Sequence, residues 1–336
     1  MKHKEAIKKL RKCAKGLLEV ARELQSSERM EPPMTLEIVE RQIRAKDGKA
    51  HGFCLPFVVG VDEFGDDVVL ELSRLPHVLI GGATGQGKTM CLNSLIAGLV
   101  ATKTPNEVRF VVYDPKCVEY TGLADLPHLI MPPVTSVEKM MEVIHWLESE
   151  VDNRLQMFAS VKCQNISQFN NRKKVNEDAE ALPKTFPYIV AVLDDITDLM
   201  RDAGKEVEPK LCRITAIARA AGIHLVMATA RPDAKVVTNA VKANVPGRIA
   251  FMTATGTDSK LLIEGSGAEN LLGNGDFLLR EGCRESVRGQ GAFVSDREIS
   301  ALVGSAAKRF GKMTADLRLG TTPSQGMPRP RGTRSG

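Results

Sequence analysis

The sequence predicts an α/β protein built around a sheet of mainly parallel strands. Its 336 residues are 43% hydrophobic, which is enough for a large core, because a chain of this length hides roughly three quarters of its unfolded surface on folding. From residue 75 onward, short apolar runs alternate with helical patterns. Parallel strands joined by crossover helices give this alternation, since helices cover both faces of the sheet. The predicted strands are 78–80, 108–113, 188–193, 224–228 and 248–253.

Three further segments flank the predicted core, which spans residues 75–300. Residues 1–30 carry apolar side chains at helical spacing on a charged stretch, which predicts a basic amphipathic helix over 4–25. Residues 31–74 combine a Pro-rich start with Val-rich and Phe-rich pieces around a turn, which predicts a small α+β segment. Residues 301–336 begin as a short helix and end in a basic, Pro- and Gly-rich tail that we expect to be disordered.

The net charge of +5 is distributed unevenly along the chain. Residues 1–29 contain nine Lys/Arg and four Glu, whereas residues 308–336 contain seven Lys/Arg and one Asp, so the two ends carry +5 and +6 and the remainder −6. Basic ends around a mildly acidic body favour contact with a polyanion. The alternative is that both ends are simply solvated.

Cysteine usage and the apolar pattern favour a cytoplasmic location. The seven cysteines stand singly, so their spacing indicates neither a zinc site nor a disulfide framework. No stretch approaches the roughly 18 uninterrupted apolar residues of a membrane helix, and the N-terminus is Lys-rich instead of apolar. We therefore expect a chain in a reducing compartment without membrane contact.

A nucleotide-binding motif, the P-loop (residues 82–89), follows the first predicted strand of the core. It reads Gly-Ala-Thr-Gly-Gln-Gly-Lys-Thr and matches G-x-x-x-x-G-K-[ST] in full, with a helical pattern after it. In this context backbone N–H groups surround phosphate oxygens at a helix N-terminus. Lys88 is expected to reach the β- and γ-phosphates of ATP, and Thr89 to offer its hydroxyl to Mg²⁺. The predicted nucleotide-binding residues are Gly82, Ala83, Thr84, Gly85, Gln86, Gly87, Lys88, Thr89 and Met90.

Two acidic residues end the predicted strand 188–193. An apolar run that stops at a pair of carboxylates is typical of the Walker B pattern. Asp194 is then the expected partner of Mg²⁺, through water, and Asp195 is the expected catalytic residue that polarises the attacking water. Asp195 has an alternative role as a cap of the helix that follows.

Six blocks of the chain, within roughly residues 53–297, together resemble the motor domain of FtsK/SpoIIIE DNA translocases. They are the P-loop and the segments 75–80, 111–116, 218–232, 242–251 and 267–276. The resemblance implies a RecA-like P-loop ATPase that assembles as a ring, usually a hexamer, and threads double-stranded DNA through its centre. It also implies ATP and Mg²⁺ as cofactors and hydrolysis stimulated by DNA.

The resemblance further implies an arginine that reaches the γ-phosphate bound by the adjacent subunit. Arg219, at the end of the helix before strand 224–228, is the first candidate. Arg231 and Arg248 are the alternatives, and each has a second possible role as a structural arginine that ties a strand end to a carboxylate. Lys242 is the predicted DNA contact, because a lysine tracks phosphates without reading sequence.

Two positions depart from the pattern of the family. Asp195 stands where these translocases generally have Glu, so the water-polarising carboxylate is one methylene shorter, and a displacement of about 1 Å can cost on the order of 10²-fold in rate. Ala230 stands where they have Gln, so a side chain that relays the state of the γ-phosphate is missing. We therefore expect nucleotide binding to survive and turnover to be reduced.

The sequence shows neither a membrane anchor nor, after residue 296, room for the winged-helix module of the family. We therefore expect a free-standing motor whose residues 4–24 bind DNA or a protein partner. Two alternatives stay open at this point. One is an ATP-gated DNA-binding scaffold with weak hydrolysis, and the other is a coupling ATPase for DNA transfer or packaging.

Overall fold

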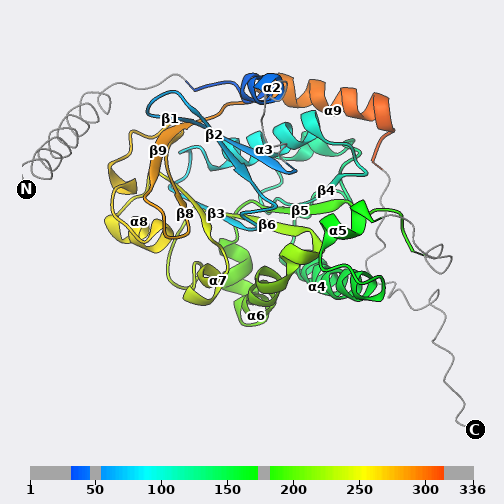
Figure 1. The fold of residues 1–336 in the computed structure, drawn as a ribbon. Helices are drawn as coiled ribbons and strands as arrows, with labels where there is room; N and C mark the ends of the chain where they lie inside the picture. The colour runs from blue at the N-terminus through cyan, green and yellow to red at the C-terminus, as the bar shows by residue number, and fades with distance from the viewer. Residues whose placement is uncertain (1–31, 46–53, 173–181, 314–336) are drawn as a thin grey trace, which may run out of the picture.

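A nine-stranded mixed sheet forms the centre of the part of the chain that the computed structural model describes, which is residues 32–45, 54–172 and 182–313 (Figure 1). The strand order is β2-β1-β9-β8-β7-β3-β6-β5-β4. The five strands from β7 to β4 are parallel, and the other four pair antiparallel. The strands are β1 (Pro56–Asp62), β2 (Asp67–Glu71), β3 (Val78–Gly81), β4 (Val108–Tyr113), β5 (Tyr188–Leu193), β6 (Ile223–Thr229), β7 (Gly247–Phe251), β8 (Asp276–Glu281) and β9 (Val287–Gly291). The α/β class and the parallel-rich sheet are confirmed.

Helices cover both faces of this sheet (Figure 1). One layer contains α2, α3 and α9, and the opposite layer contains α4, α6, α7 and α8. Successive residues of a strand pack against opposite helix layers, because side chains alternate between the two faces of a sheet. In β3, Leu79 packs on the side of α4 and α6, whereas Val78 and Ile80 pack on the side of α3 and α9. The helices are α2 (Thr35–Ala45), α3 (Lys88–Thr102), α4 (Val137–Ser160), α5 (Ile166–Asn171), α6 (Thr197–Ala221), α7 (Asn239–Ala243), α8 (Gly256–Ile263) and α9 (Asp296–Phe310), with short 3₁₀ turns η2 (Thr121–Leu123) and η4 (Ala268–Asn270).

Helix α3 is the rigid base of the P-loop. It has no charged residue after Lys88, and most of its side chains are buried between the sheet, α2 and α9. A helix that is apolar on all sides must lie inside the protein. The end of α3 that carries the P-loop is therefore fixed by packing along the whole helix.

The boundaries of the segments differ in part from those drawn on the sequence. The described residues of the predicted α+β segment, 32–45 and 54–74, contain one helix and two strands, as such a segment would, but β1 pairs with β9, so both strands extend the central sheet. Because β9 lies far along the chain, local patterns give no sign of this pairing. The last helix begins at Asp296, capped by Ser295, instead of at 301. The predicted helix 4–25 and the predicted basic tail lie outside the described residues.

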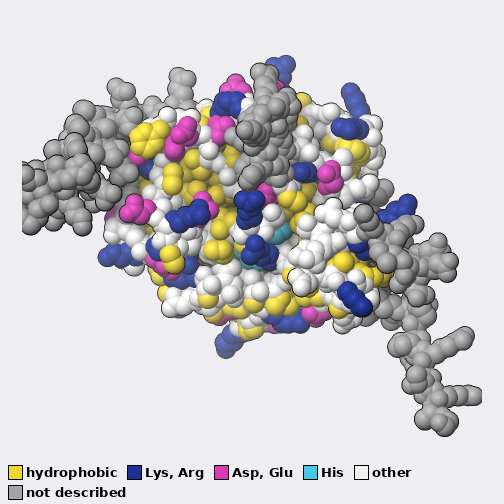
Figure 2. Space-filling model, viewed as in Figure 1, with side chains coloured by type: hydrophobic (Ala, Val, Ile, Leu, Met, Phe, Trp, Pro, Cys, Tyr) yellow, Lys and Arg dark blue, Asp and Glu magenta, His cyan; other side chains and the backbone are white. Residues whose placement is uncertain are grey.

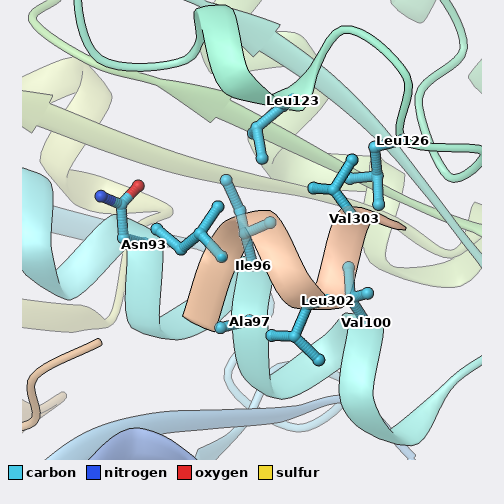
Figure 3. A pocket seen from close by; sticks show the side chains of 9 residues that line it. Asn93, Ile96, Ala97, Val100, Leu123, Leu126, Leu302 and Val303 are labelled. Atoms are coloured by element: carbon cyan, nitrogen blue, oxygen red, sulfur yellow. The ribbon is translucent and has the colours of Figure 1, made fainter. Parts of the chain in front are cut away.

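A small apolar gap lies between α3, η2 and α9 (Figure 3). Figure 3 shows Ile96, Leu123, Leu126 and Val303 pointing toward one another across it. The gap measures about 10 Å³, which is at most the room that one water molecule needs. It is a packing defect of the α3–α9 layer and has no room for a ligand.

Two buried histidines lie at the edge of the sheet where β3 and β6 begin. Leu225 N–H donates to His77 Nδ1 at 3.0 Å, and His224 Nδ1 lies 3.0 Å from the Pro76 carbonyl oxygen. Burial lowers the pKa of His77 to about 3 and that of His224 to about 4. Both rings are therefore neutral parts of the polar core, at the edge opposite the P-loop. Within the described ranges, no helix combines the length and apolar character needed to cross a bilayer.

Candidate nucleotide-binding and hydrolysis site

The P-loop bends between β3 and α3 in a way that only glycine permits at two positions. Gly82 and Gly87 have φ of 147° and 121°, which side chains rarely adopt. A Cβ on Gly82 would lie 2.8 Å from the Cβ of Phe251, and one on Gly87 would lie 3.0 Å from the Cα of Gly275. The glycines therefore allow the loop to close against β7 and against the turn before β8.

Backbone hydrogen bonds hold the loop in this position. Ala83 N–H donates to the Met252 carbonyl at 2.8 Å, and Gly275 N–H donates to the Gln86 carbonyl at 3.0 Å. Gly275 belongs to one of the segments that carry the resemblance noted above. The N–H groups of the loop that these contacts leave unused remain free to bind an anion at the start of α3.

Lys88 lies inside the loop. Its Nζ donates to the carbonyl oxygens of Gly82 and Ala83, both at 2.8 Å, and the residue is 8% exposed. Burial lowers the pKa of Lys88 to about 8, although Asp194 and Asp195 act in the opposite direction. Carbonyl dipoles compensate a buried ammonium only in part. A polyphosphate would supply the missing negative charge, so the residues fit ATP.

Asp194 and Thr89 meet at the same edge of the sheet. Thr89 Oγ1 donates to Asp194 Oδ2 at 3.4 Å, although the two residues are 105 positions apart. Asp194 is 6% exposed, and burial raises its pKa to about 6. A carboxylate beside a hydroxyl is a donor set that Mg²⁺ accepts, and a cation would repay the cost of burying the charge of Asp194.

Asp195 is held on both sides. Its Oδ1 accepts the N–H of Thr197 at 3.1 Å, and its Oδ2 lies 3.2 Å from Nζ of Lys116. Burial disfavours its charge, but the hydrogen bond from Thr197 and the nearby ammonium outweigh this and lower the pKa of Asp195. Burial thus raises the pKa of Asp194, whereas the bond from Thr197 and the ammonium of Lys116 lower the pKa of Asp195, so Asp195 is the more firmly ionised of the two carboxylates.

The two oxygens of Asp195 have different partners. Oδ1 accepts the N–H of Thr197, the first residue of α6, one position beyond the N-cap Ile196, whereas Oδ2 pairs with Lys116. The sequence reasoning named Lys116 only within the segment 111–116 and gave it no role in the site. It could have been found from the parallel pairing of β4 with β5, because neighbouring parallel strands end side by side and Lys116 follows β4 by three residues.

A second polar link joins the ends of β5 and β6. Thr197 Oγ1 and Thr229 Oγ1 lie 3.1 Å apart, and Arg231 N–H donates to Thr229 Oγ1 at 3.1 Å. Ala230 contributes no polar side chain to this edge. The hydroxyl pair, which the sequence reasoning also missed, thus joins the two strand ends together with the bond from Ile196 N–H to the Ala228 carbonyl at 2.9 Å.

An open cavity of about 270 Å³ lies beside the P-loop. Met90, Phe251 and Phe293 line its apolar walls, together with the backbone of Gly85 and Gly87. Apolar walls next to a phosphate-binding loop suit a flat heterocyclic base. Met90, one of the nucleotide contacts predicted from the sequence, is among the residues that line this cavity.

The candidate arginines occupy different edges of the sheet. Arg219 is exposed at the end of α6, where Nε donates to the Ser73 carbonyl at 3.2 Å. It lies where β6 begins, about 20 Å along a seven-residue strand from the P-loop edge. Arg219 is therefore too far to serve the P-loop of its own chain. Arg231 is exposed at the P-loop edge.

Arg248 and Lys242 are engaged in packing. Arg248 pairs with Glu264 at 2.6 Å, and its guanidinium also donates to the carbonyls of Val245 and Lys242. This matches the structural role considered for it. Lys242, on α7, is 8% exposed, so the structure does not present its ammonium on the surface of the single chain.

This fold and this site define the chain as a P-loop ATPase: a parallel sheet, a complete phosphate-binding loop at the carboxyl end of β3, and an acidic pair at the end of a neighbouring strand. The model of the FtsK/SpoIIIE family matches residues 38–234. The chain belongs to this family, as the sequence predicted.

Curated relatives and solved structures agree with this assignment. The chain is 42% identical over 259 residues to a DNA translocase FtsK of Leptospira interrogans, which covers 77% of the chain and 27% of the relative. It is 42% identical over 247 residues to a DNA translocase FtsK of Sporosarcina ureae, which covers 73% and 32%. The chain thus spans about a third or less of the length of these relatives.

Two solved structures share the fold. The pCW3 conjugation coupling protein TcpA, solved with ATPγS, aligns with a TM-score of 0.69 at 22% identity over 85% of this chain and 75% of that one. The cytoplasmic domain of the type VII secretion ATPase EccC of Thermomonospora curvata aligns with a TM-score of 0.71 at 18% identity over 88% and 36%. At these identities the likeness concerns the fold alone.

Proposed function

We propose that the chain is the motor of an ATP-dependent translocase for double-stranded DNA and works in the cytoplasm as a ring, with six copies as the expected number. The observation that carries the proposal is the complete P-loop beside Asp194 and Asp195 in a chain of the FtsK/SpoIIIE family. The relatives named above, which bear the name DNA translocase, support the choice of substrate.

The residues at the site would divide the work of hydrolysis as follows. The P-loop N–H groups and Lys88 bind the phosphates, and the cavity lined by Met90 and Phe251 receives the base. Mg²⁺, held by Thr89 and by Asp194 through water, would neutralise charge on the β- and γ-phosphates. Asp195 orients the attacking water and takes its proton, a role for which its lowered pKa keeps it ionised.

The distribution of charged side chains on the surface is relevant to how the protein would bind DNA. Figure 2 shows Lys and Arg side chains scattered among acidic and apolar ones on this face, where the side chains are visible. A single broad basic field is thus not seen there. Contact with DNA would then come from the inner surface of a ring, and a contact by Lys242 requires its side chain to turn outward from its 8% exposed position.

Stimulation of ATP hydrolysis by duplex DNA tests the proposal. With saturating ATP and Mg²⁺, linear duplex DNA is expected to raise the steady-state turnover at least tenfold, because translocation couples hydrolysis to movement along DNA. Single-stranded DNA of equal length is the control and should stimulate much less. Equal rates with and without duplex would contradict the translocase proposal.

The shared site of a ring can be tested through Arg219. Subunits with Arg219→Ala and subunits with Lys88→Ala should each be inactive, and mixing them should restore part of the ATPase activity. A mixed ring contains interfaces where an intact P-loop faces an intact Arg219. The same mixture with Arg231→Ala in place of Arg219→Ala is the matched comparison. Two inactive variants that stay inactive after confirmed co-assembly would rule out Arg219.

An ATP-gated DNA-binding scaffold is the second candidate, and the engagement of both Asp195 oxygens favours it. A base whose oxygens are both occupied takes a proton slowly. In this case ATPγS would increase the affinity for duplex DNA in fluorescence anisotropy, whereas turnover would stay low with DNA present. The translocase predicts DNA-stimulated turnover in the same samples.

A further inference from the structure

The ion pair between Lys116 and Asp195 joins an exposed side chain to a nearly buried one. The Asp195 side chain is 15% exposed and is fixed by Thr197 N–H, whereas the Lys116 side chain is 55% exposed. An ion pair that is half open to solvent contributes little to stability. The ammonium can therefore leave Asp195 at small cost, while Asp195 itself stays in place.

The loop that carries Lys116 is held firmly by its own backbone. Asp114 is 2% exposed, and its Oδ2 accepts the N–H groups of Glu119 at 3.1 Å and Tyr120 at 3.3 Å. Asp114 N–H in turn donates to the Val134 carbonyl at 2.8 Å. The backbone on either side of Lys116 is therefore fixed, and only the side chain of Lys116 is free to change its partner.

The charges around Lys116 make a change of partner favourable when a nucleotide enters. The P-loop already contains one ammonium, on Lys88, and Asp194 and Asp195 lie next to it. A triphosphate brings more negative charge than the single carboxylate of Asp195. Hydrogen bonds between ammonium and phosphate are among the strong ones, and the enclosed site screens them less than open solvent.

We propose that Lys116 is a positioning residue that responds to the terminal phosphate: its ammonium holds Asp195 when that phosphate is absent and moves to the phosphate when ATP binds, which releases Asp195 Oδ2 for water. This inference rests on the nucleotide site of the proposed function. Lys116 would then distinguish ATP from ADP and would determine when Asp195 becomes available to the attacking water. Ala230 has no polar side chain that could contact the phosphate at this site.

Nucleotide affinities measured by calorimetry test the inference without any readout of turnover. ATPγS and ADP, each with Mg²⁺, are titrated into wild type, Lys116→Met and Lys116→Arg. Lys116→Met should weaken ATPγS about tenfold, the loss of one charge-assisted hydrogen bond, and should leave ADP within about twofold. Lys116→Arg should retain most of the preference for ATPγS. Lys205→Met, at an exposed lysine of α6, is the matched control and should change neither affinity.

The outcomes separate the inference from the function on which it rests. An equal loss for ATPγS and ADP would assign Lys116 a general electrostatic or structural role and overturn the inference, as would unchanged affinities for both nucleotides. In either case wild type still binds nucleotide and the proposed function stands. If wild type binds neither nucleotide, the proposed function fails and the inference fails with it.

Discussion

Replacement of Lys88 by alanine is expected to weaken ATP binding by on the order of 10²-fold or more. The ammonium is the cation inside the P-loop, and each hydrogen bond between a charged group and phosphate contributes about 1.5–3 kcal/mol. The fold should persist, because the variant loses two bonds to loop carbonyls but also the cost of burying a charge. Calorimetric titration with ATPγS and Mg²⁺ measures the loss, and circular dichroism checks the fold.

A matched control is Lys308→Ala, at an exposed lysine near the end of α9. It removes the same charge at a distance from the P-loop, so its ATPγS affinity should equal that of wild type. If Lys88→Ala, well folded, also binds ATPγS as wild type does, then the assignment of the P-loop as the nucleotide site is wrong.

The P-loop and the acidic pair could be predicted from the sequence because both depend on local order. A complete P-loop motif after a strand fixes where phosphates bind, and two acids after an apolar run fix the neighbouring strand end. The meeting of Thr89 with Asp194 at 3.4 Å follows from parallel strands that end at the same edge.

The features of the structure that could not be predicted from the sequence depend on contacts between segments far apart in the chain. The pairing of β1 with β9 joins residues about 230 positions apart, so no local pattern indicates that the strands of the α+β segment 31–74 belong to the central sheet. Lys242 lies on a five-residue helix where a lysine usually faces solvent, and only the packing around α7 buries it. Lys116 ends the segment 111–116 that carries part of the family resemblance, but its contact with Asp195 depends on the pairing of β4 with β5.

The short acid at position 195 has a physical reason that the motif comparison did not supply. Asp195 has φ of +72°, a left-handed conformation in which Asp and Asn are several-fold enriched among residues other than glycine. Its side chain also accepts the N–H of Thr197 two residues further on, a local bond that the short side chains of Asp and Asn form with their own backbone. Backbone geometry and this local bond therefore favour Asp here, independently of its reach toward water.

Asp195→Asn is expected to lower DNA-stimulated turnover by roughly 10²- to 10⁴-fold, the usual contribution of a general base, while the affinity for ATPγS changes little. Asn is almost isosteric, tolerates left-handed φ and forms the same local bond with its own backbone as Asp. The variant should therefore keep the bond to Thr197 N–H, and it loses the ability to take a proton together with the charge that pairs with Lys116. The turnover number at saturating ATP, Mg²⁺ and duplex DNA is the measurement.

The variant Asp195→Glu tests whether turnover is limited by the length of the side chain at position 195 or whether the backbone at this position requires Asp. The added methylene should bring the carboxylate closer to the water and raise the turnover number above that of wild type, whereas the left-handed φ and the weaker local bond to Thr197 N–H should lower the stability by about 1 kcal/mol. A thermal melt recorded on the same samples shows whether both changes occur. Activity of Asp195→Asn equal to wild type would leave Asp195 with a structural role alone. If Asp195→Asn is inactive and Asp195→Glu turns over more slowly than wild type, Asp195 is still the base, and the site is adapted to the shorter side chain.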